Sequence, residues 1–178
     1  PKFLERIRHS VERVNDIVQS IRTFSHSSNP AQLKIEDLQQ LVQEVLPIVE
    51  GRFKQEQIKL EEIYPDTPVF VRANRVHLQQ VIVNLVENAI HAMRDSAEQK
   101  ITFEISQEGE DALLMIKDTG CGIPEPRLQG IFEPFYTTKE AGEGTGLGLH
   151  ICKEIMQQHQ GKIEVSSTSI TARIAKLS

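Results

Sequence analysis

The sequence predicts an α+β protein in which a layer of helices covers one mixed β-sheet. Segments with helical apolar spacing and segments with strand-like alternation follow one another along the chain. They lack the regular rhythm of parallel crossover units, which argues against a doubly wound sheet. The chain has 178 residues, of which 39% are apolar, and this is enough for one domain with a sizeable core plus a short appendage.

Composition excludes several classes of function. The formal net charge is -5, so no basic footprint for nucleic acid is present. No apolar run approaches the roughly 20 residues that span a bilayer. Cys121 and Cys152 are too few for a disulfide framework or a zinc site. We therefore expect a soluble fragment from a reducing, cytoplasmic setting, with no nucleic-acid partner.

Residues 1–29 form the first predicted unit, one long amphipathic helix. Its apolar residues step by three and four, which is a heptad seam. A single helix cannot bury such a seam alone, so we expect it to pack on another helix, on the following domain or on a partner chain. The breaker-rich residues 25–30 predict a linker, which makes residues 30–178 the second unit. The seam consists of Leu4, Ile7, Val11, Val14, Val18 and Ile21.

The second unit contains alternating strands and helices. Asp37 is a typical helix start, and the helix after it is expected to bury Leu38, Leu41, Val42, Val45 and Ile48. Residues 101–106 and 112–117 predict a hairpin, and residues 118–148 a long loop with ten prolines and glycines. Further strands are predicted at 33–35, 58–63, 69–71, 163–165 and 170–174, and further helices at 74–94 and 147–159.

The helix predicted at 74–94 carries a stripe of amides that packing does not explain. Gln80, Asn84, Asn88 and His91 follow at steps of four, four and three. Asn is a mediocre helix former, and an amide oxygen can ligate Mg²⁺ without adding charge that repels a polyphosphate. The alternative is a solvated polar face. The opposite side predicts core residues at Val81, Ile82, Leu85, Val86, Ala89 and Met93.

Two glycine-containing segments suggest a ligand site. Asp118 ends a predicted strand and precedes Gly120 and Gly122, so its carboxylate can accept from an exocyclic amine such as that of adenine. The alternative is a simple tight turn. Residues 142–149 carry four glycines and run into a helix, where backbone N–H groups can converge on an anion. This segment fits neither a Walker loop nor the dinucleotide fingerprint, and a glycine-rich lid hinge is the alternative.

The segment between these two, residues 132–139, combines aromatics with a lysine. Phe132, Phe135 and Tyr136 are expected to anchor a flap to the domain. Lys139, with the hydroxyls of Thr137 and Thr138, is placed to reach a terminal phosphate. A solvated lysine is the alternative.

Taken together and in this order, these segments resemble the ATP-binding domain of two-component sensor histidine kinases. Residues 84–89 look like the N box, 118–123 the first glycine box, 132–135 the F box and 144–149 the second glycine box. The resemblance implies a Bergerat-type two-layer sandwich that binds ATP and Mg²⁺. It implies that Asn88 ligates the metal with Asn84 assisting, that Asp118 reads adenine, and that residues 132–146 form a lid. The remaining implied nucleotide contacts are His91, Gly120, Gly122, Ile123, Phe132, Thr138, Lys139, Gly144, Thr145, Gly146, Leu147, Gly148, Leu149 and Thr171.

The resemblance also implies an activity and partners. The intact protein would be a homodimeric histidine kinase that passes the γ-phosphoryl of ATP to a His and then to an Asp of a response-regulator receiver domain. Residues 1–29 resemble the second helix of the dimerisation and phosphoacceptor hairpin. His9 and His26 are each followed by Ser rather than by an acidic residue, so the acceptor His is expected outside this fragment.

Three departures from the family pattern leave alternatives open. His91 replaces a common Lys or Arg, Gln160 replaces a common Gly, and residues 167–169 offer no glycine for the last turn, which leaves the place of Thr171 near adenine open. The alternatives are an ATP-hydrolysing relative and a non-catalytic scaffold. Hydrolysing relatives look for a Glu where Asn84 stands, which argues against the first.

Overall fold

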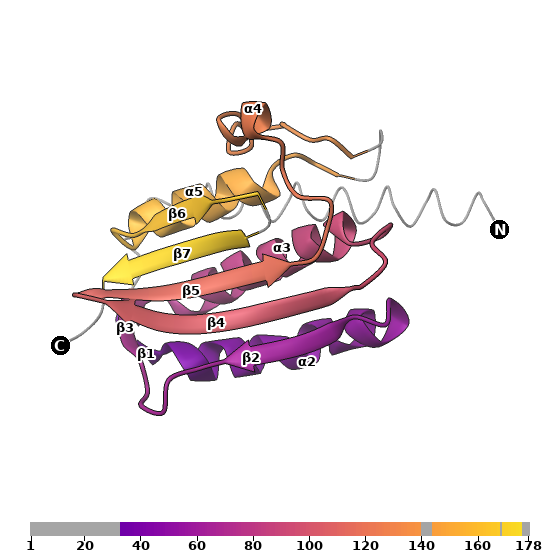
Figure 1. The fold of residues 1–178 in the computed structure, drawn as a ribbon. Coiled ribbons are helices and arrows are strands. Elements are labelled where there is room, and N and C mark those ends of the chain that lie inside the picture. Colours follow the sequence, from indigo (N-terminus) through magenta and orange to yellow (C-terminus); the bar gives the residue numbers. More distant parts are fainter. Residues whose placement is uncertain (1–32, 140–143, 168, 176–178) are drawn as a thin grey trace.

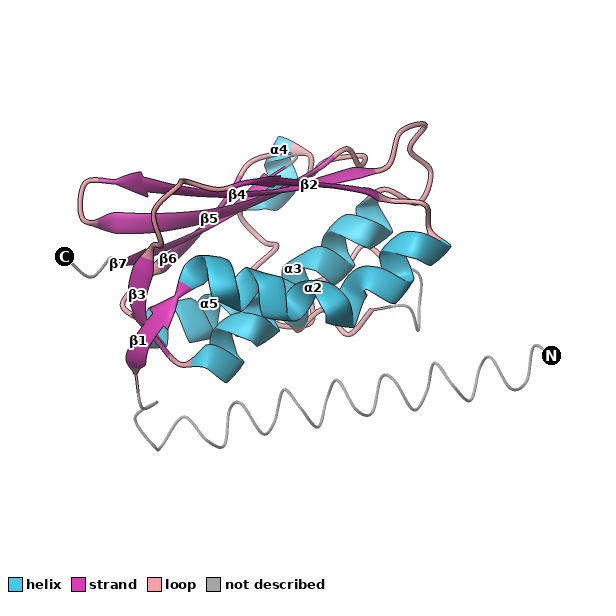
Figure 2. Ribbon diagram, turned by 90° about the horizontal axis from the view of Figure 1, so that it is seen from below, coloured by secondary structure: helices cyan, strands magenta, loops and turns pink. Residues whose placement is uncertain are grey.

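The computed structural model describes residues 33–139, 144–167 and 169–175 as a two-layer α+β sandwich. Three helices cover one face of a sheet, α2 (Leu38–Gln55), α3 (Arg75–Ala92) and α5 (Gly148–Gln158), and Figure 2 shows both layers edge-on. The fold class predicted from the sequence is confirmed. The helix predicted for residues 1–29 lies outside the described residues.

The main sheet has five strands in the order β2-β4-β5-β7-β6. Its members are β2 (Lys59–Ile63), β4 (Lys100–Glu108), β5 (Asp111–Asp118), β6 (Lys162–Val165) and β7 (Ser169–Ala175). The β2–β4 pair is parallel and the other three pairs are antiparallel, so the sheet is mixed as predicted (Figure 1). Beside this mixed sheet, β1 (Lys34–Asp37) and β3 (Phe70–Ala73) pair with each other in a second, two-stranded sheet that was not predicted.

The core lies between the helices and the helix-facing side of the main sheet. All six core residues predicted on α3 are buried, and α2 begins after an N-cap at Asp37, whose carboxylate accepts from the N–H groups of Gln39 and Gln40. The prediction that Ile48 is buried is wrong, because its side chain is 66% exposed while Val49 is 2% exposed. Val49, and not Ile48, therefore belongs to the buried face of α2.

The connections place the site at one end of the sandwich. The β4–β5 hairpin closes through Gly109 at φ 59°, the left-handed region that glycine adopts without strain. The long segment after β5 is irregular as predicted, except for the short helix α4 (Glu125–Leu128), which Figure 1 shows above α5, on the β6 side of the sheet. No helix in the described part of the chain is long and apolar enough to cross a membrane.

Helix α5 ends in a Schellman motif at Gln160, where the family resemblance leads us to expect glycine. The N–H of Gly161 donates to the carbonyl of Met156 at 2.8 Å, and that of Gln160 donates to the carbonyl of Gln157 at 3.0 Å. This geometry requires a left-handed residue, and Gln160 adopts φ 55°. The substitution of Gln for Gly therefore leaves the motif intact but strains its backbone.

Candidate functional site

The amide stripe of α3 faces the glycine-rich segments and not open solvent. The amide nitrogen of Asn84 donates to the carbonyl of Gly148, the first residue of α5, at 3.4 Å. The ammonium of Lys139 donates to Oδ1 of Asn88 at 3.3 Å. Both amides are half-buried. The stripe thus joins the segment before α5 and the Lys139 segment to one helix, which argues against a merely solvated polar face.

Asp118 lies at the end of β5 on the side of the sheet that carries the helices. It pairs in register with the buried Ile101, and it shares a face with Leu114 and Ile116 because side chains alternate along a strand. Its Oδ1 accepts from the N–H of Gly120 at 2.8 Å. Burial raises the pKa of Asp118, and the Gly120 hydrogen bond opposes the rise. The carboxylate is therefore half-buried and held in place.

The first glycine box docks on the carboxyl end of α3. A Cβ on Gly120 would lie 2.7 Å from the carbonyl carbon, Cβ and oxygen of Ala92, so only glycine fits there. The N–H of Cys121 donates to the carbonyl of Ala92 at 3.1 Å. Thr119 fixes the other side, since its hydroxyl donates to the carbonyl of Glu98 at 2.6 Å and accepts from the N–H of Lys100 at 2.9 Å. This docking sets Asp118 beside the last turn of α3, which carries His91.

The second glycine box packs against the loop that follows α4. Gly146 has φ 69°, and a Cβ there would lie 2.4 Å from the carbonyl carbon of Phe135. A Cβ on Gly144 would lie 2.8 Å from Cδ of Lys139. Close approach of two backbones brings the Lys139 segment to the start of α5. There Leu147 is the N-cap and makes no side-chain capping bond, so among the described residues no side-chain cap competes with an anion for the first N–H groups of α5.

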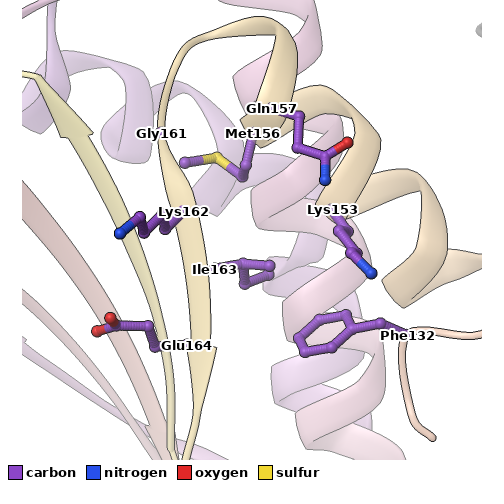
Figure 3. A pocket seen from close by; sticks show the side chains of 8 residues that line it. All are labelled: Phe132, Lys153, Met156, Gln157, Gly161, Lys162, Ile163 and Glu164. Carbon is purple, nitrogen blue, oxygen red and sulfur yellow. The ribbon is translucent and has the colours of Figure 1, made fainter. Parts of the chain in front are cut away.

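The F box anchors its loop on the outer side of α5. The Phe132 carbonyl lies 3.1 Å from Nδ1 of His150, and the Lys153 ammonium lies 5.9 Å from the centre of the Phe132 ring. Figure 3 shows Phe132 at a pocket of about 200 Å³ that also involves Met156 and Ile163. This pocket does not include the amides of α3. Phe132 therefore holds the loop, and the contact expected between its side chain and a nucleotide stays a prediction.

The aromatic anchor is only partly as predicted. Tyr136 is half-buried and packs beside Gly130, 3.5 Å from where a Cβ of that glycine would lie. Phe135, however, is 73% exposed, with φ 66°. The prediction that Phe135 anchors the flap is wrong, because its backbone, not its ring, makes the contact with Gly146.

The remaining predicted residues divide between the site and its surroundings. Thr145 accepts from the N–H of Leu147 at 3.4 Å, and Ile123 donates its N–H to the carbonyl of Ser167 at 2.8 Å, which ties the first glycine box to the turn before β7. Thr171 pairs with Met115, which is three residues before Asp118 and therefore on the opposite face of β5. Thr171 thus faces the side of the sheet away from the helices. The structure does not bring Thr171 to the site. Gly122, Thr138 and Leu149 lie in the segments just described, with Gly122 at φ 70°.

Three residues that contact this region were not identified from the sequence. Thr119 holds the first glycine box, Cys152 is buried beneath Asn84, and Arg52 forms an ion pair with Glu87 at 3.2 Å, with both side chains 41% exposed. Glu87 therefore points to α2, away from the amide stripe. Each of these contacts joins segments far apart in the chain, so no local sequence pattern predicts them.

Comparisons with known proteins agree with this geometry. The model of the family described as "Histidine kinase-, DNA gyrase B-, and HSP90-like ATPase" matches residues 73–176. The sensor histidine kinase TmoS of Ectopseudomonas mendocina is 34% identical over 168 residues, which cover 92% of this chain and 17% of TmoS. The chain spans between 17% and 32% of the first three curated relatives.

Solved structures of histidine kinases share the fold. The Acinetobacter baumannii histidine kinase AdeS superposes with a TM-score of 0.77 and 27% identity over 98% of this chain and 84% of that one. The histidine kinase ThkA, in a crystal structure with the response regulator protein TrrA, gives a TM-score of 0.78 and 26% identity over 99% of this chain and 51% of that one. The chain therefore belongs to the family of histidine kinase-, DNA gyrase B- and HSP90-like ATPases, and its described domain is of the histidine kinase type.

Proposed function

We propose that this chain is the ATP-binding catalytic part of a sensor histidine kinase, which transfers the γ-phosphoryl group of ATP to a histidine and then to an aspartate of a response regulator. One observation carries the proposal. Asn88, Lys139 and the uncapped start of α5 converge at one end of the helical layer, with the half-buried Asp118 beside the same helix. Phosphoryl transfer is mostly positioning and charge neutralisation, and this set supplies both.

Asn88 is the proposed ligand for Mg²⁺. Its Oδ1 is half-buried and already lies 3.3 Å from a cationic ammonium, so the oxygen is oriented toward positive charge. A hard amide oxygen suits Mg²⁺, which usually takes one or two protein ligands and completes its shell with phosphate oxygens and waters. When bound, the ion would neutralise charge on the phosphates and fix their orientation.

The other residues take roles that follow from their positions. Asp118 would accept a hydrogen bond from the exocyclic amine of adenine, because its half-buried carboxylate lies on the side of the sheet that carries the helices. The first N–H groups of α5 would bind phosphate oxygens, and Lys139 would neutralise the terminal phosphate. His91 would lie near the phosphates, at the carboxyl end of α3, and would add charge only when protonated.

The partners and setting are part of the same proposal. ThkA, which shares this fold, was crystallised with a response regulator protein, and this supports a receiver domain as the phosphoryl acceptor downstream. The heptad seam of residues 1–29 supports a homodimer. Neither His9 nor His26 is followed by an acidic residue, so the acceptor His is proposed to lie elsewhere in the intact protein. A kinase that consumes ATP implies a cytoplasmic position.

Hydrolysis of ATP is the less favoured alternative. Water-activating relatives use a carboxylate one helical turn before the metal ligand, and this position holds Asn84. The nearby Glu87 forms an ion pair with Arg52 of α2. Neither position therefore supplies a carboxylate that could activate water.

Calorimetric titration with ATP tests the proposal. The wild-type chain should bind ATP more tightly with Mg²⁺ than with EDTA, and Asn88→Ala should lose that difference. Gln79→Ala is the matched control, because Gln79 lies on the same helix and donates to Glu44 of α2. Magnesium-independent or absent binding by the wild type would point to a scaffold, and steady phosphate release by this chain alone would point to a hydrolase.

A further inference from the structure

The Asn84 amide is held by the first two turns of α5. Its Nδ2 donates to the carbonyl of Gly148 at 3.4 Å, and a Cβ on Gly148 would lie 3.9 Å from its Cγ. The thiol of Cys152, also in α5, is fully buried and donates weakly to the carbonyl of Val81, three residues before Asn84, at 3.9 Å. Burial raises the pKa of Cys152 to about 12 although the Asn84 bond opposes the rise, so the thiol stays protonated.

These contacts separate the two asparagines by the atoms they use. A carboxamide has two N–H donors on nitrogen and an acceptor oxygen. The nitrogen of Asn84 is directed to α5, where one turn separates Gly148 from Cys152. The oxygen of Asn88 is directed to a cation, the ammonium of Lys139. One amide therefore serves as a donor to protein, and the other as an acceptor for positive charge.

We infer that Asn84 is a positioning residue whose NH₂ group fixes the first turn of α5, and hence the second glycine box, at a set distance from Asn88. This replaces the expectation that Asn84 assists Asn88 with the metal. The expected effect on ATP binding rests on the proposed function, because the turn that Asn84 fixes is the one proposed to bind phosphates.

The first turn of α5 needs such a contact. Its N-cap is Leu147, which has no side-chain acceptor to cap the free N–H groups. The first intrahelical bond in the turn is from the N–H of Ile151 to the carbonyl of Leu147, at 2.9 Å. A turn that is not held elsewhere frays, and a ligand that binds its N–H groups must then supply the ordering entropy. Asn84 supplies this order before the nucleotide arrives.

Amide hydrogen exchange on the nucleotide-free chain tests the inference directly. Asn84→Ala removes the donor and improves the helix propensity of α3, so a loss of protection in α5 does not reflect a weaker α3. Asn84→Asp keeps the shape of the side chain but replaces its NH₂ group with a second oxygen, so it has no N–H to donate. Both variants should raise exchange at the Ile151 amide by about fivefold, the factor expected for one net hydrogen bond. Asn88→Ala, the same substitution one turn later, should leave Ile151 unchanged.

ATP binding with EDTA and with Mg²⁺ gives the second readout. Asn84→Ala should weaken binding by a similar factor, about fivefold, in both conditions, whereas Asn88→Ala should lose only the magnesium-dependent part. A pair at Cys152 tests whether the buried thiol takes part: Cys152→Ser keeps a donor for the Val81 carbonyl and should stay nearer to wild type in Ile151 exchange than Cys152→Val. Thermal melts establish that each variant is folded.

The possible results separate this inference from the proposed function. If Asn84→Ala leaves Ile151 exchange unchanged and weakens binding only with Mg²⁺, Asn84 is a metal ligand and the inference is overturned, while the proposed function stands. Unchanged exchange in Asn84→Asp alone would also overturn it, because the NH₂ group would then be dispensable. If the wild type binds no ATP, the proposed function fails, and the exchange measurement still decides the role of Asn84.

Discussion

The ammonium of Lys139 donates to Oδ1 of Asn88 across 3.3 Å, joining residues 51 positions apart. The contact brings the end of the loop after α4 to the helix that carries the amide stripe. It places a fixed positive charge where a terminal phosphate is proposed to lie, on a chain whose net charge is -5. A phosphate at this point would replace the neutral amide as the partner of the ammonium, with a stronger, charge-assisted bond.

Lys139→Met is expected to weaken ATP binding by about tenfold or more, since a hydrogen bond between charged groups contributes about 1.5–3 kcal/mol. AMP binding should change much less, because the lysine is assigned to the end of the triphosphate. Isothermal titration with ATP, ADP and AMP measures the trend, and Lys139→Arg is the charge-retaining control. An equal loss for all three nucleotides would contradict the assignment.

Asp118→Asn should weaken ATP binding by about tenfold, because the variant loses the charged acceptor for the adenine amine. Acidification should act in the same direction on the wild type. Burial raises the pKa of Asp118, so the carboxylate is protonated at a higher pH than an ordinary Asp, and affinity should fall as the pH is lowered toward that value.

The pH series should be run on the wild type and on Asp118→Asn together, by fluorescence competition or calorimetry. The variant lacks the titrating group, so its affinity should vary less over the acidic range. Parallel curves for the two proteins would assign the pH dependence to another residue, such as His91.

His159 should make folding weaken in mild acid. Its Nδ1–H donates to the carbonyl of Ile155 at 2.7 Å and its Nε2 accepts from the N–H of Asn74 at 2.9 Å, which requires the neutral ring. Burial lowers the pKa of His159 below the unfolded value of about 6.5. The stabilisation is therefore complete above about pH 6.5 and is lost as the pH falls through the folded pKa, by at most about 1.4 kcal/mol per pH unit.

Denaturant unfolding between pH 8 and pH 5 measures this loss. His159→Gln should be less stable at pH 8 and should show a flatter profile. The ring centre of His77 lies 6.1 Å from that of His159, so His77→Gln is the companion variant. Equal slopes for the wild type and His159→Gln would show that His159 is not the responsible group.

Gly120→Ala should destabilise the domain by about 1–3 kcal/mol, because the new methyl group meets the Ala92 backbone at 2.7 Å. It should also displace Asp118 and weaken ATP binding. Gly51→Ala is the matched control: Gly51 lies inside α2 with nothing within 4 Å of an added Cβ, so this variant should gain up to about 1 kcal/mol. Relative to the wild type, the changes in the free energy of unfolding should have opposite signs for the two variants. Similar changes would argue against the close approach at Gly120.

Gln160→Gly should stabilise the domain by about 0.5–1 kcal/mol, because it relieves a left-handed backbone at the end of α5. Gln157→Gly makes the same exchange inside the helix and should cost about 1 kcal/mol. Urea midpoints for the two variants provide the comparison. A loss of stability in Gln160→Gly would mean that the Gln side chain contributes more than its backbone strain costs.

Much of the fold and the site could be predicted because the signals are local. The apolar spacing on α3 identified its buried side, the Asp37 cap located the start of α2, and the alternation of β4 and β5 predicted their hairpin. The order of four short motifs predicted the family, which the comparisons confirm. The helix of residues 1–29 stays a prediction.

The sequence by itself determined the elements, the class of fold and the chemical types of the site residues, since spacing, capping and glycine content act within a few residues. Only the tertiary structure decided that Thr171 faces away from Asp118, that β1 and β3 form their own sheet, and that Asn84 points to Gly148 while Asn88 points to Lys139. These outcomes depend on strand register and on contacts between segments distant in the chain. A one-residue shift of register reverses every side chain of a strand, and no local pattern fixes it.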